Sequence, residues 1–152
     1  MALYLVQHGK SLPKEIDPDQ GLSEEGVTEV GTIANTAQMY NVLVWEILHS
    51  GKKRAQQTAE IFANRLGTNR ISAEEGLNPL DDVTRKAATI SPGTNTMLIG
   101  HLPFMERLTS YLTTGATDFT IFKFQNGGIV CLDKIESSGK WAIKWALMPR
   151  VR

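Results

Sequence analysis

Residues 2 to 9 of the chain read Ala-Leu-Tyr-Leu-Val-Gln-His-Gly. A near-continuous apolar run of this kind is typical of a strand that is buried on both faces of a sheet. Gly9 then allows a sharp turn or a close approach of the backbone to a ligand. His8 is therefore predicted at the carboxyl end of a central strand, where open α/β sheets bind their ligands. The alternative is a histidine with a structural role only.

The length and composition of the chain bound the possible functions. With 152 residues it has the usual length of one domain, and we expect residues 1–152 to form a single domain with a real core. It carries 16 basic and 16 acidic residues, and this balance argues against a general nucleic-acid binder. The one cysteine, Cys131, excludes a disulfide within the chain and is expected in the core.

The sequence predicts a soluble, cytoplasmic protein without a membrane partner. The first residues lack the basic, apolar and cleavage-site pattern of a secretory leader, and residues 2–6 are too few to span a membrane. No cluster of cysteine and histidine has the spacing of a zinc site, so we expect no metal and no cofactor. The chain is expected to be a monomer.

A loop and a helix are predicted after the first strand. Residues 10–21 are polar and contain Pro13 and Pro18, which predicts a loop that borders the crevice. Ser23 is typical of an N-cap, and the helix that it begins is expected to end near Asn41. Close packing on the sheet is expected to offset the weakening effect of two glycines in this helix. The glycines are Gly26 and Gly31, and the apolar stripe consists of Val27, Val30, Ala34 and Ala37.

A basic helix start follows the second predicted strand. Residues 42–49 read as that strand, and the helix after it is expected to continue to about Leu66. The first turn of the helix carries Lys52, Lys53 and Arg54, although cations at a helix N-terminus oppose the macrodipole. One explanation is an anion bound there by free amides and basic side chains. The alternative is a solvated basic turn. The predicted buried stripe consists of Ala55, Thr58, Ala59, Phe62 and Leu66.

The second half of the chain repeats the pattern of the first strand. An apolar strand at residues 96–99 is followed by Gly100 and His101, and Pro103 suits the first turn of a helix. Further predicted elements are a strand at 70–73, a loop at 74–82, a short helix capped by Asp82 or Asp81, and strands at 120–124, 128–135 and 140–147. The last two strands form a hairpin around Ser137-Ser138-Gly139. The sequence therefore predicts an α/β fold, a three-layer α/β/α sandwich with a mostly parallel central sheet and a C-terminal antiparallel hairpin.

Side chains that can take part in catalysis or bind an anion follow three of these strands. If the strand ends are neighbours, His8, Arg54 and His101 converge on one crevice. Two imidazoles and a guanidinium suit phosphoryl transfer, in which one imidazole attacks phosphorus and the other donates a hydrogen bond where negative charge builds up. Arginine binds phosphate in a bidentate manner, as lysine cannot.

The order of these pieces resembles the histidine phosphatase superfamily, which has the phosphoglycerate-mutase-like fold. Residues 77–82 and the run His101-Leu102-Pro103 are most similar to the short bacterial phosphohistidine phosphatase branch, as is the compact length. The resemblance covers roughly residues 1 to 110. The matching pieces are Leu5-Val6-Gln7-His8-Gly9 for the family's Arg-His-Gly motif, Leu22-Ser23-Glu24-Glu25-Gly26 for its Leu-Thr-x-x-Gly helix start, His49-Ser50-Gly51-Lys52-Lys53-Arg54-Ala55-Gln56-Gln57-Thr58-Ala59 for its Ser-Pro-x-x-Arg-Ala-x-Gln-Thr helix, and Ile99-Gly100-His101 for its second histidine.

The resemblance implies a role for each matching residue. His8 is implied as the nucleophile that becomes phosphorylated, Arg54 as the residue that binds the phosphoryl group, and His101 as the residue that stabilises it in transfer. Asp82 is the first candidate for the acid that protonates the leaving group, and Asp81 and Glu75 are the others. The alternative for Asp82 is a helix cap.

The chain departs from the family at the rim of the phosphate site. The arginine beside the nucleophile is Gln7 here, which can donate a hydrogen bond to phosphate but carries no charge. Gln20-Gly21 stands where members of the short branch tend to have Arg-Pro. We expect at least one nearby lysine to restore positive charge. The candidates are Lys10, Lys52 and Lys53.

The resemblance implies a metal-independent phosphatase that acts through a phosphohistidine intermediate on His8. Its expected partner is a protein that carries phosphohistidine, as in a phosphorelay. Two alternatives stay open at this point. One is a phosphate- or phosphoprotein-binding module with weak turnover, because Gln7 replaces the arginine, and the other is a phosphatase of small phosphomonoesters.

Overall fold

A computed structural model describes residues 2–151 of the chain. Residues 2–151 form six strands and four helices. None of these helices combines the length and the apolar character needed to cross a membrane. The elements are β1 (Leu3–Gln7), α1 (Glu24–Met39), β2 (Glu46–His49), α2 (Lys53–Leu66), β3 (Ile71–Ala73), α3 (Val83–Ala87), β4 (Thr96–Gly100), α4 (Phe104–Thr114), β5 (Ile129–Lys134) and β6 (Trp141–Leu147).

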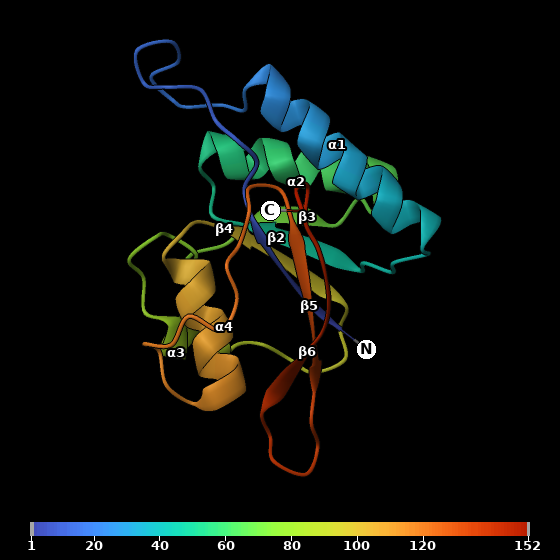
Figure 1. The fold of residues 1–152 in the computed structure, drawn as a ribbon, viewed down its shortest axis with the longest axis vertical. Coiled ribbons are helices and arrows are strands. Elements are labelled where there is room, and N and C mark those ends of the chain that lie inside the picture. Colours follow the sequence, from blue (N-terminus) through green and yellow to red (C-terminus); the bar gives the residue numbers. More distant parts are fainter. Residues whose placement is uncertain (1, 152) are drawn as a thin grey trace.

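The strands form one mixed sheet in the order β3-β2-β4-β1-β5-β6 (Figure 1). The pairs β3–β2, β2–β4 and β4–β1 are parallel, because each connection between these strands contains a helix. The pairs β1–β5 and β5–β6 are antiparallel, and Gly139 turns the final hairpin with φ 71°. The predicted mostly parallel sheet with a C-terminal antiparallel hairpin is therefore confirmed.

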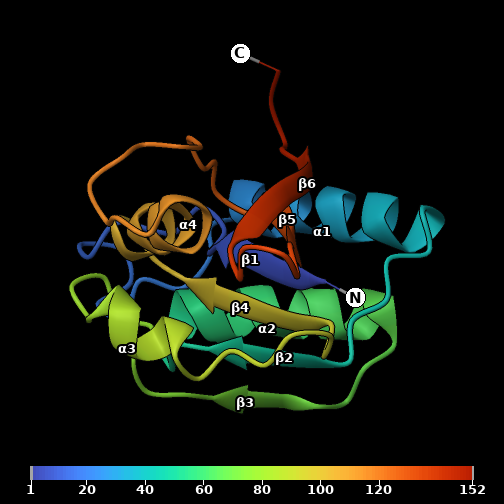
Figure 2. The ribbon, with the colours of Figure 1, turned by 90° about the horizontal axis from the view of Figure 1, so that it is seen from below.

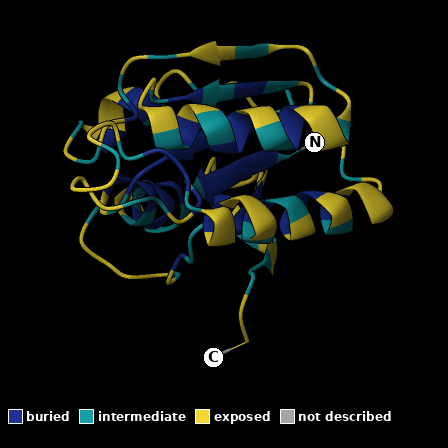
Figure 3. Cartoon of the chain, turned by 90° about the horizontal axis from the view of Figure 1, so that it is seen from above, coloured by how far each residue is buried: buried dark blue, intermediate teal, exposed yellow. Residues whose placement is uncertain are grey.

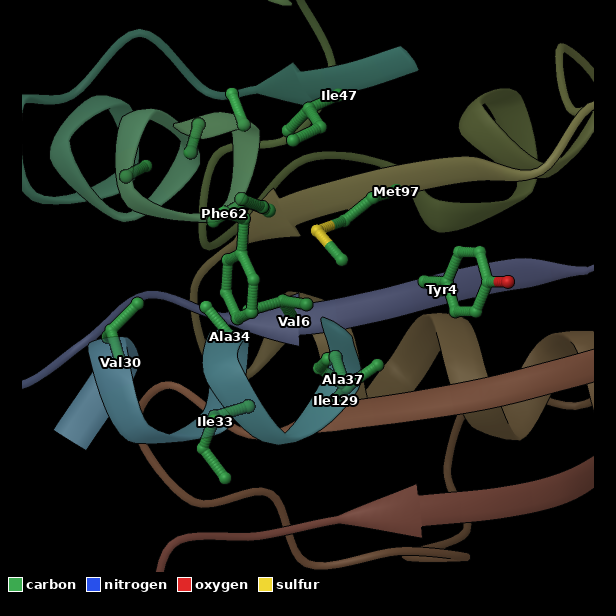
Figure 4. Close-up of a cluster of buried hydrophobic side chains, with 14 of the residues drawn as sticks. Tyr4, Val6, Val30, Ile33, Ala34, Ala37, Ile47, Phe62, Met97 and Ile129 are labelled. Carbon is green, nitrogen blue, oxygen red and sulfur yellow. The ribbon is translucent and has the colours of Figure 1, made fainter. Parts of the chain in front are cut away.

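Two apolar layers hold helices against the two faces of this sheet. Along β1, Tyr4 and Val6 belong to the core beneath α1 and α2, whereas Leu3 and Leu5 belong to the core beneath α3 and α4. Figure 4 shows Phe62 of α2 pointing toward Val6 in the first of these layers. The strands β1, β4 and β5 are largely buried, while β3 and the outer faces of the helices are exposed (Figure 3). The three-layer arrangement follows from this alternation of buried side chains.

The strand order creates a crevice at the carboxyl ends of β1 and β4. These neighbouring parallel strands are followed by α1 and α4, which cover opposite faces of the sheet. The connections therefore diverge at this edge, which is where open α/β sheets bind ligands. Figure 2 shows the β4 arrow ending on the side where the loops after β1 and β3 lie.

Three sequence expectations about the elements are wrong. Residues 120–124 are irregular, because no strand within residues 2–151 pairs with them. Their apolar alternation arises from Phe122 and Phe124, which form an edge-to-face pair against the α3–α4 core. The second strand begins at Glu46, and residues 42–45 are an irregular approach to it. Val27 is 49% exposed, because the buried stripe of α1 runs beside it through Gly26, Val30, Ile33, Ala34 and Ala37.

The two glycines of α1 have different surroundings. A Cβ on Gly26 would lie 2.1 Å from the backbone oxygen of Lys10, so this position needs glycine because of the loop after β1. A Cβ on Gly31 would have no atom within 4 Å. The expectation of close packing on the sheet is therefore wrong for both residues, since Gly26 packs on a loop and Gly31 faces open space.

This contrast predicts opposite effects of the same substitution. Gly31→Ala should raise the free energy of unfolding by about 0.5–1 kcal/mol, because alanine favours a helix interior. Gly26→Ala should lower it by about 1–3 kcal/mol, because neither backbone can move freely to remove the overlap. Urea unfolding of the two variants beside the parent protein measures both effects, and equal effects would contradict the packing described above.

Candidate active site

The two histidines that follow buried strands lie side by side. Gln7 and Gly100 are register partners on β1 and β4, and the His8 N–H donates to the Gly100 carbonyl at 3.0 Å. The hydrogen bond from His8 extends the β1–β4 pairing by one residue beyond the two strands. His101, which follows Gly100, therefore lies opposite His8. The ring centroids of the two histidines are 4.9 Å apart. A Cβ on Gly9 would lie 2.6 Å from Val30 of α1, which explains the glycine after His8.

Arg54 completes the predicted group of three residues. It is the second residue of α2, and its Nε donates to His8 Nε2 at 3.3 Å. Within residues 2–151 no side chain caps α2, since Lys52 is its N-cap and makes no side-chain cap bond. The free amides of a helix N-terminus attract anions, so this end of α2 and the Arg54 guanidinium form one anion-binding corner beside His8.

The hydrogen bonds of His8 determine which of its ring nitrogens is free. Nδ1 lies 2.7 Å from the Gly9 carbonyl, which can only accept, so Nδ1 carries the proton. Nε2 then carries a lone pair, and it is this nitrogen that accepts from Arg54. Burial, with a further contribution from the Arg54 charge, lowers the pKa of His8 to about 4 although the Gly9 bond raises it. His8 is therefore neutral at pH 7, with an unprotonated Nε2.

Thr58, which the sequence places in the buried stripe of its helix, and Asn126, which no sequence pattern singled out, hold this strand end in place. Thr58 of α2 is fully buried, and its Oγ1 accepts from the Gly9 N–H at 2.9 Å and donates to the Arg54 carbonyl at 2.7 Å. Asn126 donates from Nδ2 to the His8 carbonyl at 3.0 Å. The two contacts join residues that are 49 and 118 positions apart in the sequence, so no local sequence pattern could predict them.

His101 is almost fully buried and differs from His8 in its contacts. Its Nε2 lies 2.6 Å from Ser50 Oγ, and its Nδ1 is buried without a hydrogen-bond partner among residues 2–151. Burial, followed by the charges of His8, Arg54 and Lys52, lowers its pKa to about 3. His101 is therefore a neutral imidazole at pH 7, and a neutral imidazole can donate only one hydrogen bond.

The predicted phosphate-binding side chains at the rim are placed differently from one another. Gln7 is partly exposed, and its Oε1 is buried without a hydrogen-bond partner within the described chain. The ammonium groups of Lys10 and Lys53 are in ion pairs, with Glu25 at 2.8 Å and Asp17 at 2.9 Å. Lys52 alone of the three lysines contributes to the lowered pKa of His101. A phosphate-binding role for Gln7, Lys10 and Lys53 stays a prediction.

The candidate acids line a cavity of about 660 Å³ that also contains Ser50. Asp82 caps α3, accepting from the Thr84 backbone N–H at 2.9 Å and from the Thr84 hydroxyl at 2.7 Å, and these bonds lower its pKa. Asp81 accepts from the Asn78 N–H at 2.9 Å. Glu75 is exposed in the same cavity and has no hydrogen bond or ion pair within residues 2–151. Over the same range, no group of three or more metal-ligating side chains comes together.

Comparison with known proteins places this site in a family. The sequence model of the histidine phosphatase superfamily (branch 1) matches residues 3–81, which is half of the chain and includes His8 and Arg54. The chain belongs to the histidine phosphatase superfamily. No curated protein matches the chain in sequence.

Several solved structures have the same fold along nearly their whole length. The protein histidine phosphatase SixA complexed with tungstate is 24% identical, with a TM-score of 0.83 and coverage of 98% of this chain and 97% of that one. A protein from Agrobacterium tumefaciens assigned as a phosphohistidine phosphatase SixA is 25% identical, with a TM-score of 0.78 and 97% coverage of both chains. A mycobacterial glucosyl-3-phosphoglycerate phosphatase complexed with VO3 is 15% identical, with a TM-score of 0.73 and coverage of 97% and 99%.

Proposed function

We propose that the chain is a phosphatase in which His8 Nε2 attacks phosphorus and becomes phosphorylated. The observation that carries this proposal is the unprotonated Nε2 of a neutral His8, which accepts from Arg54 Nε at 3.3 Å and lies beside the ring of His101. A nitrogen lone pair is the nucleophile that the reaction needs, and a guanidinium and an imidazole beside it suit the negative charge of a phosphoryl group.

The proposed reaction has two steps. In the first, the Nε2–P bond forms while the bond from phosphorus to the leaving group breaks, and the leaving group takes a proton from an acid. In the second, water attacks phosphorus, the N–P bond breaks, and the same carboxylate accepts a proton from the water. Arg54, the amides at the start of α2 and His101 would hold the phosphoryl oxygens in both steps. We propose that this set of donors makes a metal unnecessary.

The proposed substrate is a phosphohistidine on another protein. The loops that flank the crevice carry large aliphatic side chains in water, with Ile16 69% and Leu80 82% exposed. Such side chains suit a protein surface and offer a small phosphoester no polar contact. The likeness to SixA structures supports the same choice. The alternatives are a small phosphomonoester and a binding module with weak turnover, the latter because Gln7 is uncharged.

Glu75 is the proposed acid, in preference to Asp82. A carboxylate that already accepts two hydrogen bonds is stabilised in its charged form, so it has no proton to donate at neutral pH, which describes Asp82. Glu75 lines the same cavity as Ser50, and its carboxylate is not engaged by any residue in 2–151. The resemblance implied Asp82 as the first candidate and left a helix cap as its alternative role, and Asp82 does cap α3.

Substitution of the two carboxylates distinguishes acid from cap. Glu75→Gln should reduce turnover of a substrate with a poor leaving group by roughly 10²-fold or more and affect an activated aryl phosphate little, because only the poor leaving group needs a proton. Asp82→Asn should change both rates by the same small factor. The ratio of the two rates is the measurement, and a ratio that shifts only in Asp82→Asn would reassign the acid to Asp82.

A phosphoenzyme trap tests the proposed function itself. The protein is incubated with a radiolabelled phosphohistidine protein or a labelled small phosphoester, quenched in base and cut with trypsin. Each of the three histidines falls in a different tryptic peptide, since cleavage after Lys10, Lys52 and Arg107 separates them. We expect acid-labile, base-stable label in the peptide that contains His8, and none in the His8→Gln variant.

The outcomes of the trap separate the three candidate functions. Label on His8 from the protein donor, with slow or no labelling by the small ester, supports the proposed substrate. Label from the small ester alone supports the phosphomonoesterase. The absence of label from both donors, together with phosphate binding that requires Arg54, would overturn the proposal in favour of the binding module.

A further inference from the structure

Ser50 sits at the end of β2 in a turn that aims it at His101. The turn forms because Gly51 has a φ of 88°, which favours glycine, and because the Gly51 N–H donates to His49 Nδ1 at 3.1 Å. Ser50 Oγ then lies 2.6 Å from His101 Nε2, across 51 positions of sequence. The same oxygen accepts the Lys52 backbone N–H at 3.4 Å. Ser50 also lines the cavity of the candidate acids.

The single proton of the neutral His101 ring has two possible positions. A proton on Nδ1 would be a buried donor without an acceptor in residues 2–151, because Nδ1 has no partner there. A proton on Nε2 has an acceptor at 2.6 Å in Ser50 Oγ and leaves only a lone pair unpaired on Nδ1. Buried N–H groups without acceptors are rarer than unpaired acceptors, because the unmet donor loses its bond to water outright. The contacts therefore favour the proton on Nε2.

We propose that Ser50 is a positioning residue that holds the proton of His101 on Nε2. This inference rests on the proposed function, because only a protonated Nε2 can donate to a phosphoryl oxygen that approaches from His8. In the free protein Ser50 Oγ accepts that bond. When a phosphoryl group is bound, one of its oxygens takes the place of Oγ as acceptor. The Ser50 hydroxyl hydrogen is not needed for its bonds to His101 and Lys52, so it remains free to donate to the same phosphoryl group.

Nitrogen NMR of labelled histidine tests the position of the proton independently of catalysis. The two ring nitrogens of a neutral imidazole differ strongly in shift according to which one is protonated, and the three histidines are assigned from His8→Gln and His49→Gln spectra. We expect His101 to be protonated on Nε2 in the parent protein. Ser50→Ala should give a mixture of both tautomers, and Ser50→Thr, which keeps the hydroxyl, should restore the Nε2 form.

Kinetics give the functional readout of the same variants. Ser50→Ala should reduce kcat by roughly 10- to 100-fold with little change in KM, because the substrate still binds but the donor to the transferring group is populated only in part. Ser50→Thr should recover most of the lost kcat. Ser137→Ala, at an exposed position in the hairpin turn, is the matched control and should behave as the parent protein.

Failure of the inference is distinguishable from failure of the proposed function. His101 protonated on Nδ1 in the parent protein, or an unchanged tautomer in Ser50→Ala, would overturn the role of Ser50 even if the protein is a fast phosphatase. A protein that forms no phosphoenzyme but shows the predicted tautomer shift in Ser50→Ala would support the role of Ser50 and reject the phosphatase. A full kcat in Ser50→Ala would also overturn the inference.

Discussion

The hydrogen bond from His8 Nδ1 to the Gly9 carbonyl is the constraint on which the site depends. The Nδ1 atom lies 2.7 Å from this carbonyl oxygen, so the ring proton stays on Nδ1 and Nε2 is left unprotonated. Burial keeps the ring neutral, because a charged imidazole would lose its hydration between the sheet and α2. Much of the nearby structure holds this bond in place: Thr58 and Asn126 secure the backbone on either side of it, and Gly26 lets the loop after β1 pass close to α1.

The proposed phosphate site contains more uncharged than charged groups. Arg54 is the one guanidinium against His8 in the described chain, whereas both histidines are neutral and Gln7 is an amide. Lys10 and Lys53 are already paired with carboxylates, so their charges are largely compensated before a substrate arrives. In the proposed site, Lys52, the helix start of α2 and neutral N–H donors then contribute much of the binding, and this makes the tautomers of His8 and His101 more important than they would be beside a second arginine.

Much of the site could be predicted from the sequence because its signals are local. An apolar strand with a glycine and a histidine at its end occurs twice, both copies lie where the pattern indicates, and Arg54 donates to His8. The Ser23 cap of α1, the doubly buried strands and the final hairpin follow from equally local rules. What could not be predicted depends on contacts between distant segments, such as Ser50 on His101 and Asn126 on His8. The irregular run at 120–124 has the alternation of a strand without a strand to pair with, a fact that only the tertiary structure contains.

The most direct test of this account is an NMR titration of the His8 ring nitrogens. We expect a proton on Nδ1 and an unprotonated Nε2 at pH 7. As the pH falls, the ring should stay neutral through 6.5, the ordinary pKa of histidine, and take up its second proton only near pH 4, because the folded protein disfavours the charged ring. A proton on Nε2 at pH 7, or a titration near pH 6.5, would contradict the claim that the fold prepares His8 as a nucleophile.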